Sequence, residues 1–524
     1  MITSCEISKN CFAIGPFFGG GVTIWKQQVR ALNLVYHLAA ERRIRNELVP
    51  HPRGLVKQKR IAVIGGGVSG MTAAVAAASL GNEVWHFEQR TELCHLQAGC
   101  ETRWVHPHIY EWPDPGSENP YAGLPLLTWQ AGTAAEVART LTVSYERYEK
   151  TLNGKLNKLL GATTFFADGR VSWDNCSNPQ FRGGSDKFDI TIIASGFGVE
   201  HGVHSGKVDS YWRNDSLNQP RPGIRSEKSE LIFISGTGDG GLVDVLRSKI
   251  RGYNQSKITQ ELFTAADRSL VEKLRTVKAT SPALLFDAFS DLWSDFPNEH
   301  AGFWTRLNDR LRHDVVLILN GREPTLRDTL RLNKASLQNS FLTYILYIMG
   351  AFTYVPGELI EHGRDWVMLG MTQRSSTVRR TPHTSECKLA TTKAGTKYSV
   401  DRVIVRHGTD KEDCLMAIGF KSQMVRSLEE RQSKVGDDSF FKVAWDPGWW
   451  TRVTTEGLEH ERKEFLPEAS QALAAVFTSS SASRFTGFAA LTARLIFSRW
   501  LRTLAVRVAI RLESSLATWV SLAL

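Results

Sequence analysis

Cysteine is scarce in this chain of 524 residues, and the few copies follow no recognisable pattern. The seven cysteines lie at positions 5, 11, 94, 100, 176, 387 and 414. Their odd number and irregular spacing argue against the disulfide framework of a secreted protein. There is no C-x-x-C motif and no zinc-ligand spacing, so we expect no metal site. The N-terminus also lacks a basic stretch followed by an apolar core, which argues against a signal peptide and favours a cytoplasmic protein.

Long apolar runs are missing as well. In the C-terminal tail the longest run without charge covers 514–524, which is 11 residues and too short to span a bilayer. Arginines interrupt the rest of the tail and fall on no single helical face, so we do not expect it to contact a membrane. These are Arg494, Arg499, Arg502, Arg507 and Arg511.

Basic residues outnumber acidic residues only modestly. The chain has 64 basic and 54 acidic residues, a net charge of +10, and no basic stripe with interleaved aromatic residues. We therefore expect no nucleic-acid partner, although the excess suits a polyanionic cofactor. With 42% hydrophobic and 23% charged residues, the composition is that of a globular protein long enough for two or three domains.

Residues 60–88, RIAVIGGGVSGMTAAVAAASLGNEVWHFE, carry the strongest pattern. An apolar strand leads into Gly65-x-Gly67-x-x-Gly70, and an alanine-rich helix and a second strand ending in Glu88 follow. This order is typical of a mononucleotide-binding βαβ unit. We expect Gly65 to turn the chain off the strand, Gly67 to admit a pyrophosphate to the helix N-terminus, and Gly70 to allow close helix packing. Glu88 is predicted to bind the ribose hydroxyls, which favours a free ribose over a 2′-phosphate.

The same predicted site includes Val68, Ser69 and Gln89, which flank the glycines and the acid. An alternative is that the glycines only make a tight connection between strand and helix. That alternative leaves the acid at the end of the second strand unexplained.

A second glycine turn follows the apolar strand LIFIS at 231–235. It contains Gly236-x-Gly238-x-x-Gly241 and predicts a second dinucleotide site by the same reasoning. Asp239, inside the turn, is a candidate contact to a ribose or substrate, or a turn residue. The segment 255–264 only weakly resembles the strand that should follow and end in an acid or arginine. The choice between NADH and NADPH therefore remains open. A glycine-rich connection that shapes a substrate cavity is the alternative.

Other elements follow from periodicity and caps. A capping box at Thr133–Glu136 predicts a helix through about residue 150. Residues 258–362 are predicted to be mainly helical, and 371–400 to form loops or hairpins. A helix is predicted over 23–48, and strands are predicted at Ile190–Ala194, Val315–Leu319, Arg402–Arg406 and Cys414–Ile418.

Taken together, these motifs resemble the glutathione-reductase-like flavoproteins, the FAD-dependent pyridine-nucleotide oxidoreductases with two dinucleotide-binding domains. The 60–88 unit resembles their FAD fingerprint, and DITIIASGFG at 189–198 resembles the strand that returns beneath the flavin. CLMAIGF at 414–420 resembles the strand that re-enters the FAD domain. The second glycine turn stands where the family's inserted NAD(P) domain carries its own. By this resemblance Ser195 and Gly196 also belong to the cofactor site.

The resemblance implies an α/β fold with a Rossmann-like, three-layer FAD-binding domain around a parallel sheet. It also implies an inserted second nucleotide- or substrate-binding domain and helical extensions. The usual late G-D motif is not evident after residue 425, and the segment before the first strand is longer than usual. The predicted division is an N-terminal helical extension 1–58, FAD domain 59–200, inserted domain 201–400, FAD return segment 401–475 and helical tail 476–524.

Flavin chemistry needs little from protein side chains, because the cofactor performs it. Between Glu88 and the capping box, Arg103 is predicted to pair with phosphate oxygens. His106 and His108 are the candidate catalytic residues, as donors to the flavin or as acid/base groups. The alternative is a proline-rich packing loop with satisfied histidines.

Cys94 and Cys100 are spaced C-x5-C rather than the C-x4-C of a disulfide-reductase pair, so ordinary thiols are expected. Two segments next to the domain junctions, 211–215 and Arg406-His407, are candidates for a substrate site.

The expected function is that of an FAD-dependent oxidoreductase that takes electrons from NAD(P)H and acts on an unidentified small molecule. One alternative is a flavin oxidase, similar to amine oxidases, that uses oxygen. A second is a non-catalytic dinucleotide-binding sensor or assembly module. Neither the substrate nor the oligomeric state leaves a pattern in the sequence.

Overall fold

The computed structural model describes the greater part of the chain. All described residues belong to one compact unit, Met1–Gly457. The predicted tail at 476–524 and Cys387 lie outside them. The described residues are 2–15, 17–18, 23–41, 43–44, 58–196, 200, 210–217, 229–294, 300–332, 334–370, 389–391, 395–409, 411–435, 443–445 and 449–450.

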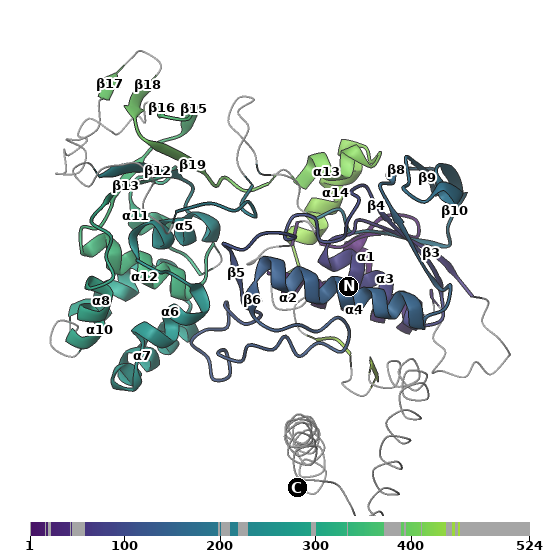
Figure 1. Ribbon diagram of the computed structural model, residues 1–524, viewed down its shortest axis with the longest axis horizontal. Coiled ribbons are helices and arrows are strands. Elements are labelled where there is room, and N and C mark those ends of the chain that lie inside the picture. The colour runs from purple at the N-terminus through teal and green to yellow at the C-terminus, as the bar shows by residue number, and fades with distance from the viewer. Residues whose placement is uncertain are drawn as a thin grey trace, which may run out of the picture. The chain divides into compact units, whose positions relative to one another are not determined.

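The first sheet has six strands in the order β1-β2-β11-β3-β4-β7. Figure 1 labels β3 and β4 of this sheet. The strands from β2 to β7 run parallel, and β1 is antiparallel to β2. Their apolar runs suit strands that are covered on both faces. The bounds are β1 (Glu6–Ser8), β2 (Cys11–Ala13), β11 (Ile190–Ile193), β3 (Arg60–Ile64), β4 (Glu83–Glu88) and β7 (Leu156–Leu160).

Helices cover one face of this sheet and an antiparallel layer covers the other. The helices α2 (Ile24–Ala40), α3 (Val68–Ser79) and α4 (Ala134–Thr151) share one apolar core with the sheet. The opposite face packs in a separate core against the three-stranded sheet β8-β9-β10 and the helices α13 and α14. The predicted three-layer α/β fold is therefore confirmed. The bounds are β8 (Thr163–Ala167), β9 (Arg170–Asp174), β10 (Gly184–Lys187), α13 (Lys411–Ala417) and α14 (Ser422–Ser433).

Local signals in the sequence set the starts of α4 and α2. The Thr133 hydroxyl accepts a hydrogen bond from the Glu136 N–H at 3.2 Å, and Glu136 Oε2 accepts one from the Thr133 N–H at 2.8 Å. This reciprocal pair confirms the predicted capping box. Thr23 caps α2 in a similar way, through the Lys26 N–H. The helix ends at Ala40, earlier than the predicted 48.

The N-terminal segment contributes strands as well as helix. After the short α1 (Ile2–Cys5), β1 and β2 form a hairpin, and β2 pairs in parallel with β11. The Ile14 N–H continues this ladder to the Ile193 carbonyl at 2.9 Å. The parallel strand beside β11 therefore comes from the start of the chain.

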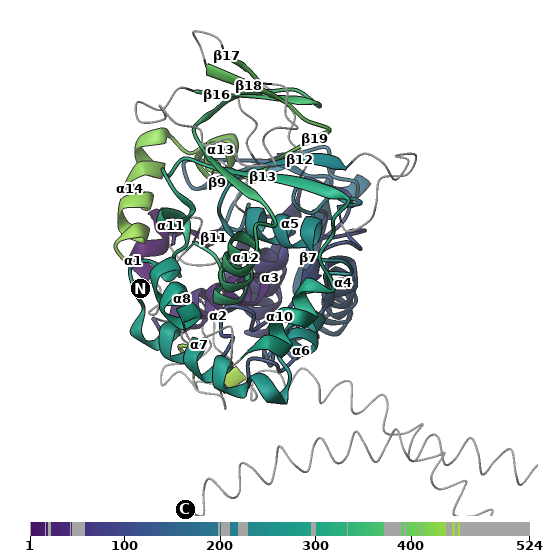
Figure 2. The ribbon, with the colours of Figure 1, turned by 90° about the vertical axis from the view of Figure 1, so that its left-hand side faces the viewer.

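The second sheet repeats the strand order of the first. Its four parallel strands follow the order β14-β13-β12-β19, which matches β7-β4-β3-β11 in the order of the chain. An antiparallel sheet, β15-β16-β18-β17, covers one face, and helices that begin with α5 cover the other. Figure 2 shows these layers, with the antiparallel sheet above, the parallel sheet between and the helices below.

The strands of this half are β12 (Glu230–Ser235), β13 (Val315–Gly321), β14 (Thr353–Pro356), β15 (Leu359–His362), β16 (Trp366–Gly370), β17 (Leu389–Thr391), β18 (Gly395–Ser399) and β19 (Arg402–Val405). The helices are α5 (Asp239–Lys249), α6 (Gln255–Leu262), α7 (Arg268–Thr280), α8 (Leu285–Ser294), α10 (Ala301–Asn308), α11 (Leu326–Thr329) and α12 (Leu337–Ile348). A two-stranded sheet of β5 (Trp104–Val105) and β6 (Gly132–Thr133) lies in the segment between β4 and α4.

Three expectations about late elements need correction. The predicted strand at 414–418 is wrong, because residues 411–417 form α13, where Leu415 packs into the same core as Phe166 and Phe420. A short apolar run of this kind does not distinguish a buried strand from a buried helix turn. The strand at 402 is present as β19, but it pairs with β12 in the second sheet. The region 258–362, predicted as mainly helical around one strand, also contains β14 and β15.

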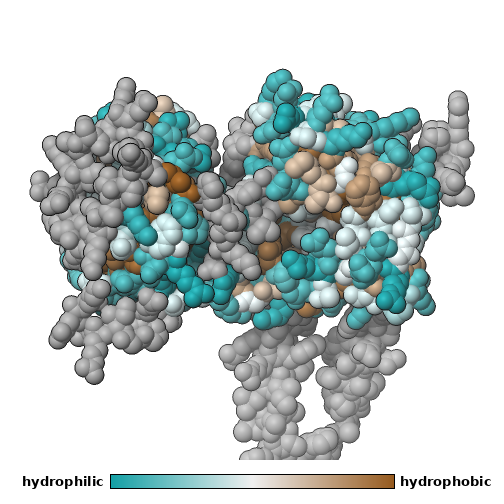
Figure 3. Space-filling view, turned by 90° about the horizontal axis from the view of Figure 1, so that it is seen from above, coloured by the Kyte–Doolittle hydropathy of each residue, from teal (hydrophilic) through white to brown (hydrophobic). Residues whose placement is uncertain are grey.

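The surface is mostly hydrophilic, with isolated apolar patches on the face shown in Figure 3. Phe165 on β8 and Met416 on α13 are among the large apolar side chains that remain exposed. Within the described residues no helix combines the length and apolar character that crossing a membrane requires.

Candidate functional site

The first glycine turn joins β3 to α3, and two of its glycines are required by the packing of the chain itself. Gly65 has a φ of +116°, and a Cβ there would lie 2.2 Å from the Ala194 carbonyl oxygen. A Cβ on Gly70 would lie 1.8 Å from the Gly65 carbonyl oxygen. Larger residues at either position would push β11 or α3 away from β3.

Gly67 differs from both of these glycines. Its φ of −74° is open to any residue, and it is the N-cap of α3. A Cβ added at Gly67 would meet nothing within 4 Å. Neither backbone conformation nor internal packing therefore requires glycine here. Its absence of a side chain leaves open space in front of the α3 N-terminus, where backbone N–H groups favour an anion.

Glu88 closes the other side of this turn from the end of β4. Its Oε2 accepts a hydrogen bond from the Gly66 N–H at 2.5 Å, and its Oε1 accepts one from the Arg90 N–H at 2.6 Å. A carboxylate has about four lone-pair positions, so both oxygens can still accept hydroxyl groups.

The remaining residues predicted for this site fall into two groups. Ser195 and Gly196 come one residue after the end of β11, and a Cβ on Gly65 would lie 3.0 Å from the Ser195 nitrogen. Val68 and Ser69 are buried in the first turn of α3, and Gln89 is exposed. The structure therefore brings the first glycine turn, Glu88 and Ser195 together at the carboxyl edge of the first sheet, where ligands of open α/β sheets bind.

The second glycine turn has the same geometry. Gly236 has a φ of +125°, with the Arg406 carbonyl oxygen 2.2 Å from its added Cβ, and the added Cβ of Gly241 lies 2.0 Å from the Gly236 carbonyl oxygen. Gly238, the N-cap of α5, again has nothing within 4 Å.

Asp239 is engaged by the chain itself. Its Oδ1 accepts hydrogen bonds from the Ser336 N–H at 3.0 Å and from Asn339 Nδ2 at 2.8 Å. Its own N–H donates to the Lys334 carbonyl at 3.2 Å. Burial raises the pKa of the Asp239 carboxyl, although these donors oppose the shift. This carboxylate ties the start of α12 to the start of α5.

In the second half, the strand position that corresponds to Glu88 is not occupied by an acid. Ile64, the last residue before the first glycine turn, pairs with Phe87. Ser235, the last residue before the second turn, pairs with Asn320. Gly321 therefore occupies the position in β13 that Glu88 occupies in β4. The weak strand considered at 255–264 is wrong, because 255–262 form α6. The missing strand is β13. Among the described residues, the helices α6, α7, α8 and α10 come between α5 and this strand.

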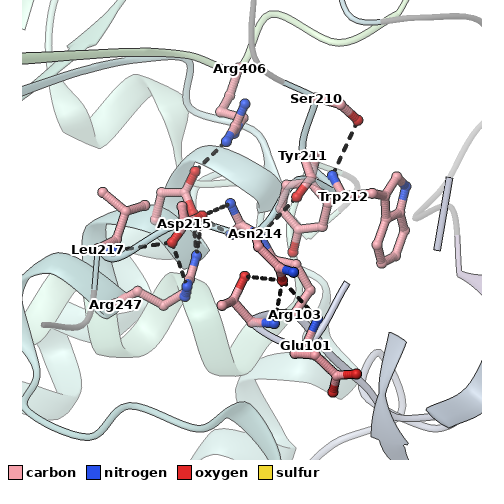
Figure 4. A network of polar contacts seen from close by, with 12 residues as sticks. Glu101, Arg103, Ser210, Tyr211, Trp212, Asn214, Asp215, Leu217, Arg247 and Arg406 are labelled. Atoms are coloured by element: carbon pink, nitrogen blue, oxygen red, sulfur yellow. Dashed lines mark hydrogen bonds and ion pairs between the residues drawn. The ribbon is translucent and has the colours of Figure 1, made fainter. Parts of the chain in front are cut away.

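Arg103 does not take the role that the sequence predicted. Its side chain is 1% exposed, and all three guanidinium nitrogens have partners within the chain (Figure 4). It donates to Asp244 Oδ1, to Asp215 Oδ2 at 3.0 Å and to the Tyr211 carbonyl at 2.8 Å. The Tyr211 ring also packs against the guanidinium, with 4.1 Å between ring centroid and Cζ. The predicted phosphate contact is replaced by these partners.

Arg103 belongs to a group of six buried or half-buried charges that we call the charged cluster: Arg103, Glu200, Asp215, Asp244, Arg247 and Arg406. Arg247 contacts both oxygens of Asp215, at 2.9 and 2.7 Å, and Arg406 Nε donates to Asp244 Oδ2 at 2.8 Å. Burial alone would raise the pKa of Asp244, but the guanidinium groups of Arg103 and Arg406 lower it on balance. Burial raises the pKa of Glu200.

A pocket of about 300 Å³ lies beside the charged cluster. It lies where the segment between β4 and α4 and the segment between β11 and β12 meet α5. Besides cluster members, its lining includes Glu101, Trp104, Thr133, Val243, Tyr253 and Asn254.

His106 and His108 find partners within their own segment. His108 Nδ1 lies 2.6 Å from Glu111 Oε2, which raises the pKa of His108. The backbone N–H of His108 donates to His106 Nδ1 at 3.1 Å. Burial lowers the pKa of His106 to about 4, so that this imidazole is neutral at pH 7. Their assignment as catalytic residues stays a prediction.

Cys94 and Cys100 are both buried, and neither is in a disulfide. Cys94 Sγ lies 3.3 Å from Met71 Sδ, and burial raises the pKa of Cys94 to about 12. Burial also raises the pKa of Cys100. A thiol with a raised pKa is a poor nucleophile, which agrees with the expectation of ordinary thiols.

Sequence reasoning missed two residues at the first glycine turn and one contact at the second. His86 and Tyr145 form a buried hydrogen-bonded pair that reaches the Gly65 carbonyl. Spacing offered a signal for His86, since residues 86 and 88 of a strand point to the same face. Beside the second turn, His407 Nε2 lies 2.7 Å from Ser235 Oγ.

Comparison with known proteins gives a fold likeness only. No protein-family model matches the chain, and no curated protein matches it. Among solved structures, a bacillithiol disulfide reductase from Staphylococcus aureus has 9% identity and a TM-score of 0.35, over 70% of this chain and 81% of that one. A thioredoxin reductase from Lactococcus lactis has 11% identity and a TM-score of 0.31, over 67% and 78%. An NAD-dependent persulfide reductase from A. fulgidus has 11% identity and a TM-score of 0.30, over 69% and 48%. Similarity at this level does not identify a family or an activity for this chain.

Proposed function

We propose that this protein is an FAD-dependent oxidoreductase that accepts electrons from NAD(P)H and passes them to a small-molecule substrate. The observation that carries the proposal is the open space at Gly67. Gly65 and Gly70 are explained by internal packing, whereas no described atom lies within 4 Å of a Cβ added at Gly67. The missing side chain there lets a group outside the chain approach the backbone. A pyrophosphate at the α3 N-terminus is such a group.

The residues around the first turn fit the ADP half of FAD. The glycines and the first turn of α3 would hold the pyrophosphate, and the Glu88 carboxylate would accept the ribose hydroxyls. Ser195 and Gly196 would approach the cofactor from the end of β11. When bound, FAD supplies the hydride chemistry. The protein supplies binding and orientation.

One observation favours FAD over NAD at the first turn. The segment 189–198, which forms β11 and the residues after it, resembles the flavin strand of the glutathione-reductase-like proteins. The second turn then remains for the electron donor, since Gly238 repeats the open space of Gly67.

A flavin oxidase is the second candidate function, and Gly321 favours it. An NAD-binding turn is expected to end its second strand with an acid for the ribose, and β13 has glycine at that position. In this version the second half would shape a substrate site, and electrons would pass from substrate to oxygen.

The two open glycines provide a matched pair of variants for the test. Gly67→Leu and Gly238→Leu both introduce a side chain where the backbone allows one and where the chain leaves space. Absorbance and mass spectrometry of the purified wild-type chain identify the cofactor. Gly67→Leu is expected to lose FAD. Gly238→Leu is expected to keep FAD but to lose anaerobic reduction by NADPH or NADH.

Each outcome decides one part of the proposal. A colourless wild-type protein that takes up no FAD contradicts the flavoenzyme. Full FAD occupancy in a folded Gly67→Leu variant contradicts the assignment of the first turn. A wild-type flavin that neither nucleotide bleaches, but a substrate amine does, identifies the oxidase.

A further inference from the structure

We propose that His86 and Tyr145 are positioning residues that hold one peptide group of the first glycine turn in the orientation a dinucleotide requires. The inference rests on the proposed function, because it concerns the site assigned there to FAD. It adds two side chains that lie behind the turn rather than in contact with the ligand.

Two side chains of β4 hold a single peptide group of the turn, one at its carbonyl and one at its N–H. His86 Nε2 lies 2.9 Å from the Gly65 carbonyl oxygen, and Glu88 Oε2 lies 2.5 Å from the Gly66 nitrogen. The carbonyl of Gly65 and the N–H of Gly66 belong to the same peptide group. Residues 86 and 88 share a face of β4, so the strand holds the carbonyl with one side chain and the N–H with the next on that face.

The hydrogen bonds fix the tautomer of His86. A backbone carbonyl only accepts, so Nε2 must carry the hydrogen. In the neutral ring Nδ1 is then an acceptor, and the Tyr145 hydroxyl, 2.8 Å away, must donate to it. Burial lowers the pKa of His86 to about 4 and raises that of Tyr145 well above its usual value, so neither group ionises near neutral pH. Tyr145 on α4 thus sets the tautomer that holds Gly65.

We call the clamp the arrangement in which His86 holds the Gly65 carbonyl and Glu88 holds the Gly66 N–H. It restricts a turn that is otherwise conformationally permissive, because the turn is rich in glycine. Gly65, Gly66 and Gly67 lack the Cβ atoms that restrict other residues, and rotation of the peptide between the first two would cost little by itself. A rotated peptide would release the Gly66 N–H from Glu88 and point the Gly65 carbonyl toward the phosphate position. A carbonyl dipole there would repel the anion that the α3 N-terminus attracts.

The second turn is a natural comparison. By the strand register, Leu319 stands where His86 stands and Gly321 stands where Glu88 stands. Neither can hold a peptide group by a side-chain hydrogen bond. The clamp is therefore a property of the first turn and not of the shared strand-turn-helix geometry.

Three full-length variants test the clamp. His86→Leu removes the donor, His86→Gln restores an amide donor of similar reach, and Tyr145→Phe removes only the hydroxyl. Tyr148→Phe, on the same helix, is the matched control. FAD and ADP dissociation constants are measured on apoprotein. We expect His86→Leu to weaken both about tenfold, the equivalent of one lost hydrogen bond, and Tyr145→Phe to weaken them less. His86→Gln should recover most of the loss and Tyr148→Phe should change nothing.

A second readout does not depend on a loaded cofactor. Long-range ¹H–¹⁵N spectra of the chain labelled on histidine nitrogen report the tautomer of His86. The wild type should show hydrogen on Nε2, and Tyr145→Phe should show a mixture of tautomers. Hydrogen on Nδ1 in the wild type, or wild-type affinity for FAD and ADP in a folded His86→Leu variant, would overturn the clamp. If the wild type binds neither FAD nor ADP, the proposed function fails, and the tautomer spectrum alone decides the arrangement behind the turn.

Discussion

The charged cluster makes a strong prediction about stability. Three arginines face three acids, and Asp244, which is 0% exposed, contacts Arg103 and Arg406. Asp244→Asn keeps the size of the side chain but leaves the buried guanidinium groups one negative charge short. Removing one partner of a buried ion pair typically costs about 3–5 kcal/mol. Because Arg247 also lies 3.5 Å from Asp244, this carboxylate serves three arginines, and we expect a loss in the upper part of that range.

The assay is urea denaturation of the full chain, followed by fluorescence and far-UV circular dichroism. The matched control is Asp287→Asn, since Asp287 also pairs with an arginine, Arg327, but their side chains are 42% and 57% exposed. An exposed ion pair of this kind contributes little to stability, because solvent screens the two charges. The control should therefore shift the unfolding midpoint far less than Asp244→Asn does.

The pH dependence gives an independent check with a definite sign. Folding lowers the pKa of Asp244. Its stabilisation is therefore fully present above the unfolded-state pKa, about 3.9, and is lost as the pH falls through the lower folded-state value. Asp244→Asn should lose stability at neutral pH and converge toward the wild type in acid. Similar losses for Asp244→Asn and Asp287→Asn, or a gap between Asp244→Asn and wild type that widens in acid, would refute the reasoning.

Three further outcomes are expected from single features. Thr133→Ala should cost about 1 kcal/mol in urea denaturation, because it removes the capping box of α4, and Thr133→Ser should restore most of it. Gly65→Ala should destabilise by more than about 1 kcal/mol, since its positive φ and the nearby Ala194 carbonyl leave no room for a Cβ, and an unchanged melting temperature would contradict this. Iodoacetamide at pH 8 should modify the half-buried Cys414 before the fully buried Cys94, whose pKa burial raises to about 12, and peptide mass mapping gives the order.

Both glycine turns were predictable because their signals are local. Each turn, the strand before it and the helix after it lie within one short stretch of sequence, and each glycine has a distinct steric reason within that stretch. The capping box at Thr133 is local in the same way. The three-layer fold was implied by the resemblance to glutathione-reductase-like flavoproteins, which these units and the strand at residue 190 carry.

Long-range pairings were not predictable from the same signals. β2 has three residues, and its place in the sheet depends on β11, far along the chain. Arg103 looked like a phosphate ligand because its true partners, Asp215 and Asp244, are more than a hundred residues away. The strand corresponding to β4 in the second half was sought too early, because the helical segment from α6 to α10 separates α5 from β13.

The two turns show how one geometry supports different roles. Gly67 and Gly238 both leave open the start of a helix, but β4 brings His86 and Glu88 to the first turn while β13 brings Leu319 and Gly321 to the second. A clamped turn with an acid suits a cofactor that stays bound, because preorganised groups lose less entropy on binding. An unclamped turn without an acid is expected to bind a dinucleotide more weakly. Under the proposed function, this difference between β4 and β13 assigns the resident flavin to the first turn and an exchanging nucleotide to the second. Under the oxidase alternative, it leaves the second turn to shape a substrate site.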